Sequence, residues 1–131
     1  MVEDRITDGT RIAELLSSEV TGHERDPYGR LAVTNASPDV EPTADGARAY
    51  DVELDGERFA AVYVQPERVR VELYAGLEAA RAEAASRDLR TRPVASEPPR
   101  LVVFVPDGAR TKRALDVLGV AADARDDDDD N

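Results

Sequence analysis

The stretch YDVELDGERFAAVYVQP, residues 50–66, carries the clearest secondary-structure signal in this chain. Its first half alternates apolar residues with carboxylates, which is the pattern of a half-buried strand. Its second half is apolar on both sides from Phe59 to Val64, as expected of a strand in the middle of a sheet. Asp55-Gly56 separates the halves and is a strong signal for a tight hairpin turn. The stretch therefore predicts two antiparallel strands at the centre of a sheet.

Further elements are expected on both sides of this hairpin. Apolar residues at helical spacing predict a first helix in TDGTRIAELLSSEVTG, and alanine-rich residues 75–89 and the segment after Pro106 predict two more. Alternating or apolar runs predict additional strands at residues 30–35, 68–74 and 101–105. The expected fold is α+β, a mainly antiparallel four-stranded meander plus one further strand, in the order α-β-β-β-β-α-β-α.

The domain organisation follows from where this patterning stops. Residues 1–120 are expected to form a single α+β domain, since 131 residues suffice for one modest core. Residues 90–100, which are rich in proline, are predicted to be an extended connector. After Val120 the sequence ADARDDDDDN is dominated by like charges, so residues 121–131 are predicted to be a disordered acidic tail.

The composition is strongly acidic. The chain has 28 Asp and Glu against 17 Lys and Arg, a net charge of -11, and Lys112 is its only lysine. This excess of acid with almost no lysine resembles the uncharacterised small acidic cytosolic proteins of halophilic archaea. The resemblance implies adaptation to molar salt, where a Debye length of about 3 Å screens the repulsion between surface carboxylates.

Several classes of protein are excluded by what the sequence lacks. With no cysteine, disulfides, thiol nucleophiles and Cys-ligated metals are ruled out. No apolar run approaches the length of a membrane span, and the N-terminus does not resemble a signal peptide. The chain is therefore expected to be cytoplasmic, with no membrane association and no cofactor.

The acids of the opening hairpin raise the question of a metal site. The order of the predicted elements resembles that of restriction-endonuclease-like nucleases, in which an Asp on one strand and a Glu-x-Lys triplet on the next hold the metal and the attacking water. Asp51 corresponds to the Asp, but the second strand ends in Tyr63-Val64-Gln65 where the triplet should stand. No metal site is predicted, and the acids are interpreted as a solvated surface. A degenerate scaffold of this kind that still binds nucleic acid is the alternative.

Two further motifs carry weaker signals for a site. His23 is the only histidine, but no nucleophile motif accompanies it, so no catalytic residue is predicted. The turn after the strand at residues 101–105 leads into a helix whose start could bind an anion. The residues of that predicted anion site are Arg110, Thr111, Lys112 and Arg113. The alternative is an ordinary helix start capped by Asp107.

The distribution of charge suggests a second surface. Residues 66–113 hold 10 basic and 7 acidic residues, a net charge of +3 in an otherwise acidic protein. The predicted partner or nucleic-acid surface consists of Arg68, Arg70, Tyr74, Arg90 and Arg92. It requires these arginines to form one continuous patch. The alternative is that they pair with nearby glutamates.

These observations favour a non-catalytic intracellular interaction or accessory protein adapted to high salt, with a protein partner that the sequence does not identify. The alternative function is a nucleic-acid-associated protein that uses the arginine-rich surface. A homodimer is also compatible with the apolar central strand.

Overall fold

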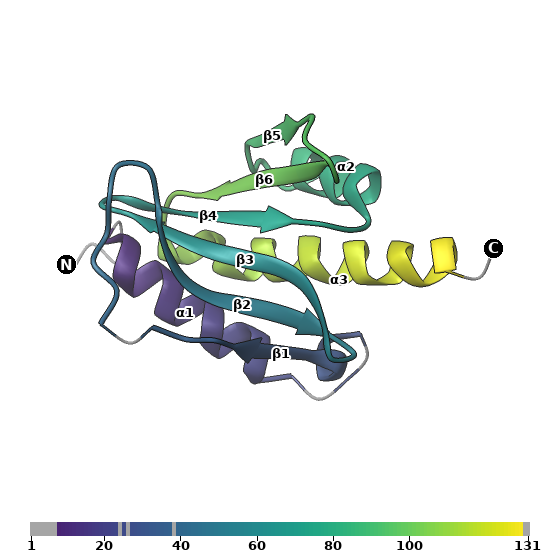
Figure 1. The fold of residues 1–131 in the computed structure, drawn as a ribbon, viewed down its shortest axis with the longest axis horizontal. Coiled ribbons are helices and arrows are strands. Elements are labelled where there is room, and N and C mark those ends of the chain that lie inside the picture. The colour runs from purple at the N-terminus through teal and green to yellow at the C-terminus, as the bar shows by residue number, and fades with distance from the viewer. Residues whose placement is uncertain (1–7, 24, 26, 38, 130–131) are drawn as a thin grey trace.

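The computed structural model describes residues 8–23, 25, 27–37 and 39–129. Within them, six strands form one antiparallel sheet in the order β1-β2-β3-β4-β6-β5 (Figure 1). The bounds of the strands are β1 Leu31–Thr34, β2 Ala47–Leu54, β3 Glu57–Gln65, β4 Arg68–Leu73, β5 Thr91–Val94 and β6 Arg100–Val105. The predicted α+β fold and its mainly antiparallel sheet are thereby confirmed.

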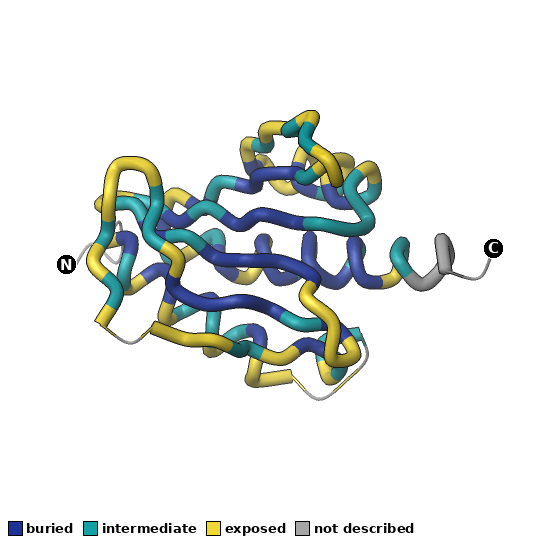
Figure 2. Tube along the Cα trace, viewed as in Figure 1, coloured by how far each residue is buried: buried dark blue, intermediate teal, exposed yellow. Residues whose placement is uncertain are grey.

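The opening hairpin is confirmed as β2 and β3. Asp55 and Gly56 connect the strands with positive φ angles of 53° and 83°, as a two-residue turn of the mirror-image type requires. A bulge between Val52 and Glu53 shifts the register and brings Phe59 into the hydrophobic core together with Ala60. Both strands lie in the middle of the buried region (Figure 2).

The three helices of the described chain pack against one face of the sheet (Figure 1). They are α1 Gly9–Thr21, α2 Leu77–Ser86 and α3 Thr111–Asp129. The core between helices and sheet is built mainly from alanine, valine and leucine, with Phe59 its largest fully buried side chain. Because these side chains are small, the helices approach closely, and a Cβ at Gly76 would lie 2.2 Å from the Ala121 carbonyl oxygen.

Local side-chain contacts define both ends of α1. The Asp8 carboxylate accepts a hydrogen bond from the Thr10 amide at 3.0 Å and caps the helix. Gly22 follows the helix with a φ of -86° and is not in the left-handed conformation that is common at helix ends. The helix ends instead in a turn in which the Thr21 hydroxyl donates to the Ser17 carbonyl at 3.0 Å.

The sheet has one strand more than the sequence predicted. Residues 91–94, expected to belong to an extended connector, form β5 and pair with β6. Pro93 argued against a strand because proline cannot donate a backbone hydrogen bond. β5 lies at the edge of the sheet, where an unpaired position is tolerated, and this explains the difference.

The predicted disordered tail is also corrected for most of its length. Helix α3 does not end near residue 120 but continues to Asp129. Ala121 and Ala122 are fully buried, and Arg125 donates to Asp55 at 3.2 Å and to the Leu54 carbonyl at 3.5 Å. The apolar pattern therefore extends one turn further than the charge run suggested. Residues 130–131 lie outside the described residues.

Candidate functional site on the uncovered sheet face

The two faces of the sheet differ in what covers them. One face packs against the helices, whereas the other, turned toward the viewer in Figure 1, carries no helix of the described chain. We call the second one the open face. The cross-strand pairs define a row of side chains on it that spans all six strands: Thr34, Asp51, Ala61, Glu72, Val102 and Arg92.

Arginine is the dominant side chain of the open face. The register of the strands, including the bulges between β2 and β3, places six arginines of the described chain on the open face. They are Arg48, Arg58, Arg68, Arg70, Arg92 and Arg100. Beneath these side chains, Ala61 and Val102 are buried although they do not belong to the hydrophobic core under the helices. The arginines therefore cover the apolar floor of this face with their stems.

Asp51 is buried on the open face and surrounded by donors. Its carboxylate accepts from Asn35 Nδ2 at 2.8 Å and from Arg48, and Arg58 Nε lies 3.9 Å away. Burial raises the pKa of Asp51, but the hydrogen bonds from Asn35 and Arg48 and the two guanidinium charges outweigh it, so the pKa lies below its usual value. The carboxylate is thus ionised near neutral pH and has its acceptors occupied.

Glu72 has the corresponding role on β4. Its carboxylate lies 3.2 Å from Arg70 Nη2 and 3.5 Å from Arg100 Nη1, and its side chain is 5% exposed. The Nε atoms of Arg70 and Arg100 are buried and have no hydrogen-bond partner among the described residues. Buried donors without a partner are uncommon in proteins and are often found at functional positions.

Aromatic rings hold three of the arginines in place. The guanidinium groups of Arg58, Arg68 and Arg70 lie 4.7, 4.3 and 4.9 Å from ring centroids. The rings belong, in the same order, to Tyr74, Phe104 and Tyr63. Such stacking is worth about 0.5–1 kcal/mol where it is exposed, and it restricts the guanidinium plane.

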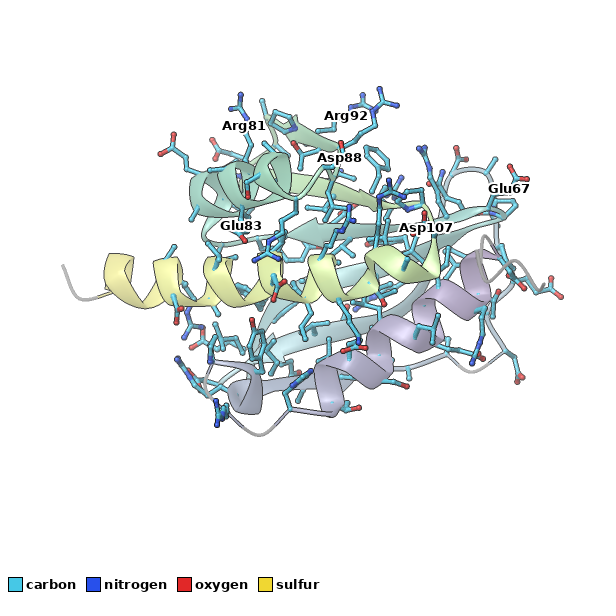
Figure 3. The ribbon with its side chains drawn as sticks, turned by 180° about the vertical axis from the view of Figure 1, so that it is seen from behind. Glu67, Arg81, Glu83, Asp88, Arg92 and Asp107 are labelled. Atoms are coloured by element: carbon cyan, nitrogen blue, oxygen red, sulfur yellow. The ribbon has the colours of Figure 1, made fainter. Side chains whose placement is uncertain are left out.

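The residues of the predicted partner surface are largely brought together. Arg68, Arg70 and Arg92 line one cavity of the open face, and Tyr74 stacks with Arg58 on the same face. Arg90 precedes β5, is exposed, and does not line that cavity. Figure 3, seen from the helical side, shows Arg92 extending from the edge of the molecule beside β5.

Sequence reasoning missed three arginines of the open face. Arg100 was assigned to the connector, and Arg48 and Arg58 belong to an N-terminal half whose net charge is negative. Strict alternation would have placed Arg48 and Arg58 on the covered face with Tyr50 and Ala60, and it is the bulges of this strand pair that bring them to the open face. Pairing of the arginines with nearby glutamates was the alternative to an open patch, and Glu72 does bind Arg70 and Arg100.

The predicted anion site at residues 110–113 is not assembled. The Asp107 carboxylate accepts from the Arg110 amide at 3.0 Å and also binds the Arg110 guanidinium, next to the first turn of α3 (Figure 3). Thr111 is buried and donates to the Gly108 carbonyl, while Arg113 donates to the Arg87 carbonyl. Lys112 is exposed. Asp107 therefore fills the place that an anion would take.

The acids of the hairpin and the single histidine lie outside both predicted sites. The interpretation of the hairpin acids as solvated is wrong for Asp51, which is 3% exposed. Asp55 and Glu57 are exposed and Glu53 is half-buried, and Asp55 also binds Arg30 and Arg125. His23 is exposed and lies 3.5 Å from Glu19 Oε1.

The described part of the chain has neither a cluster of metal ligands nor a helix suited to a membrane. No group of three or more His, Asp or Glu residues there is arranged to hold a metal ion. Likewise, no described helix has the length and apolar character needed to cross a bilayer.

Comparison with known proteins places the chain in a family. The model of the family of unknown function DUF7993 matches residues 1–131, the whole of the sequence. The chain belongs to this family. No curated protein and no solved structure matches it.

Proposed function

We propose that this member of DUF7993 is a non-catalytic interaction protein whose open face binds an acidic protein partner. The observation that carries the proposal is that arginines line the sheet face on which no described helix packs, in a chain of net charge -11. A basic face on an acidic protein favours a partner that presents carboxylates, through attraction during the encounter and selection against basic surfaces.

The composition of the open face supports a protein partner. Arginine, tyrosine and phenylalanine are enriched at protein interfaces, whereas lysine is depleted, and lysine is absent from the strands of this sheet. Arginine and tyrosine are also frequent among the residues that contribute most to binding. Because Asp51 and Glu72 already hold four of the arginines, less side-chain entropy is lost when a partner binds.

Nucleic acid is the second candidate, favoured by the three stacked guanidinium groups. Arginine planes can stack on unpaired bases and contact phosphates. Against this, Asp45, Asp51, Glu53 and Glu72 lie on or beside the same face and interrupt the continuous positive charge that an extended phosphate backbone requires. A polyanion with no counter-charges fits this mixed surface less well than a protein does.

Adaptation to high salt forms part of the proposal. The charge of -11 with a single lysine is consistent with an intracellular protein of a salt-adapted organism. At about 1 M salt, long-range steering is weak because surface charges are screened. Affinity would then depend on desolvated contacts, such as carboxylates inserted between the stacked arginines.

The proposal is tested by capturing partners from an extract of the source organism in molar KCl, with and without nuclease treatment. Immobilised wild-type protein is compared with the double variant Arg68→Glu/Arg92→Glu and with Lys112→Glu, whose exposed side chain lies on the helical side. We expect one protein to be retained by the wild type and Lys112→Glu and lost by the double variant. Equal retention by all three would exclude the open face, and loss only after nuclease treatment would favour nucleic acid.

A further inference from the structure

The open face contains a cavity of about 330 Å³. It lies over β4, β6 and β5 and is bounded at one end by Ala44 and Asp45 of the loop between β1 and β2. Four of its lining residues are arginines, accompanied by Glu72 and by apolar side chains. The arginines are Arg68, Arg70, Arg92 and Arg100. Four cationic side chains around one cavity are unexpected in a chain whose net charge is -11.

Three of these guanidinium groups are positioned by the protein itself. Arg68 stacks on Phe104 and donates from Nε to Gln65 Oε1 at 2.8 Å. Arg70 and Arg100 are held from below by Glu72, at 3.2 and 3.5 Å. The cavity wall is therefore preorganised, and binding of a ligand requires little ordering of these side chains.

The charges of the cavity do not balance. Its four arginines are opposed by two carboxylates, those of Glu72 and Asp45, which leaves two positive charges. Arg70 and Arg100 pair with Glu72, whereas neither Arg68 nor Arg92 forms an ion pair within the described residues. The site thus has both surplus charge and surplus donors.

We propose that this cavity binds a phosphate monoester. A monoester carries a charge of about -1.5 to -2 at neutral pH and three acceptor oxygens, which matches the two uncompensated charges and the spare donors. Guanidinium forks suit phosphate oxygens because they can bind them in pairs. A carboxylate, with one charge and two oxygens, would leave the site partly unsatisfied. The spare donors belong to Arg68 and Arg92, because Arg70 and Arg100 are held by Glu72.

The phosphate can come from either of two sources: a phosphorylated side chain of the protein partner or a free phosphorylated metabolite. This inference rests on the proposed function, because the cavity forms part of the open face. The volume of the cavity is several times that of a phosphate group, so either source would fit. The shared requirement is a terminal phosphate that inserts between the arginines.

Calorimetric titration in about 1 M KCl tests the inference, since screening at that ionic strength suppresses loose surface attraction more than binding in a cavity. The probes are O-phosphoserine, a short phosphoserine peptide, its aspartate counterpart and inorganic phosphate. We expect the phosphorylated probes to bind at least about tenfold more tightly than the aspartate peptide. Affinity should fall between pH 7.5 and pH 5.5, because the second phosphate pKa is about 6 and the dianion becomes protonated. Preference for the peptide over O-phosphoserine would indicate a protein source.

The variants Arg92→Glu and Lys112→Glu provide a matched pair with the same change of charge. Because both side chains are exposed, both variants are expected to fold, and their thermal midpoints check this. Arg92→Glu should weaken phosphoserine binding at least about tenfold, a change of about 1.4 kcal/mol, and Lys112→Glu should not. Equal effects of the two variants, or equal affinity for phosphoserine and aspartate peptides, would overturn the inference.

The outcome is separable from that of the proposed function. If no phosphorylated probe binds while the Arg68→Glu/Arg92→Glu variant still loses its partner, the cavity inference fails and the interface remains. If O-phosphoserine binds but no partner depends on the open face, the interface fails and the cavity is a site for a phosphorylated metabolite.

Discussion

Asp51 and Glu72 lie in one cross-strand row with only Ala61 between them. Each carboxylate is buried and bound by two arginines, Asp51 by Arg48 and Arg58, and Glu72 by Arg70 and Arg100. Their oxygens are thus already occupied and serve to hold guanidinium groups in place. The arrangement gives the open face its fixed cationic surface.

Replacement of Asp51 by Asn should lower the free energy of unfolding at pH 7 by about 1–3 kcal/mol, because charged hydrogen bonds to Asn35 and Arg48 are weakened. The pKa of Asp51 is depressed in the folded protein. Its contribution is therefore present above the unfolded value of about 3.9 and is lost as the pH falls through the folded pKa. Urea unfolding at pH 7 and near pH 3 measures both effects, and the difference between wild type and variant should narrow at the lower pH.

Asp39→Asn is the control for this prediction, since it makes the same chemical change in an exposed loop. It should change stability by no more than about 0.5 kcal/mol at either pH. A loss of stability equal to that of Asp51→Asn would show that net charge alone, rather than the arginine contacts, determines the effect.

The close approach of α2 and α3 can be tested at Gly76. This residue has a φ of 63°, and an added Cβ would lie 2.2 Å from the Ala121 carbonyl oxygen. Gly56 has a φ of 83° but open space around it, so Gly56→Ala reports only the backbone penalty of about 1–2 kcal/mol. Gly76→Ala should cost at least about 2 kcal/mol more in urea unfolding. Equal costs would mean that the two helices are not packed as closely as described.

Truncation tests whether the end of α3 belongs to the domain. A chain ending at residue 125 keeps Ala121, Ala122 and the contact of Arg125 with Asp55, and it should unfold close to the wild-type midpoint. A chain ending at residue 120 loses them and should be less stable by about 2–4 kcal/mol. If the two truncated chains have the same thermal midpoint, residues 121–125 are a tail as the sequence first suggested.

Salt dependence tests the proposed adaptation. Because the net charge is -11, repulsion should destabilise the protein in dilute buffer and be screened as salt is added. We expect the thermal midpoint to rise by several degrees between about 0.1 and 2 M KCl. Sucrose at matched osmolality stabilises without screening and is the control. A midpoint that is unchanged or lower in KCl would contradict the adaptation.

Much of the fold follows from local sequence patterns, and the exceptions have physical causes. The hairpin at residues 47–65 was predictable because alternation and Asp55-Gly56 agree. β5 was not, since Pro93 is tolerated only because tertiary structure places the strand at an edge. The end of α3 was obscured because the charge run starts within the same helix that buries Ala121 and Ala122.

The candidate site was predictable only in part. Charge counting along the chain identified Arg68, Arg70 and Arg92, which lie near one another on β4 and β5. It could not identify Arg48 or Arg58, since cross-strand pairing brings them to the same face from an acidic half of the chain. Whether helices cover that face depends on how they pack against the sheet. Local sequence patterns do not encode this packing.

The central claim, that the open face is the binding surface, is tested most directly by nuclear magnetic resonance of the arginine Nε–H groups in isotopically labelled protein. The captured partner is added stepwise in molar KCl. The account predicts shifts for the arginines of the open face, with Arg92 and Arg68 among the largest, and unchanged signals for Arg11 and Arg113 on the helices. Shifts confined to Arg11 and Arg113, with the open-face signals unchanged, would contradict it.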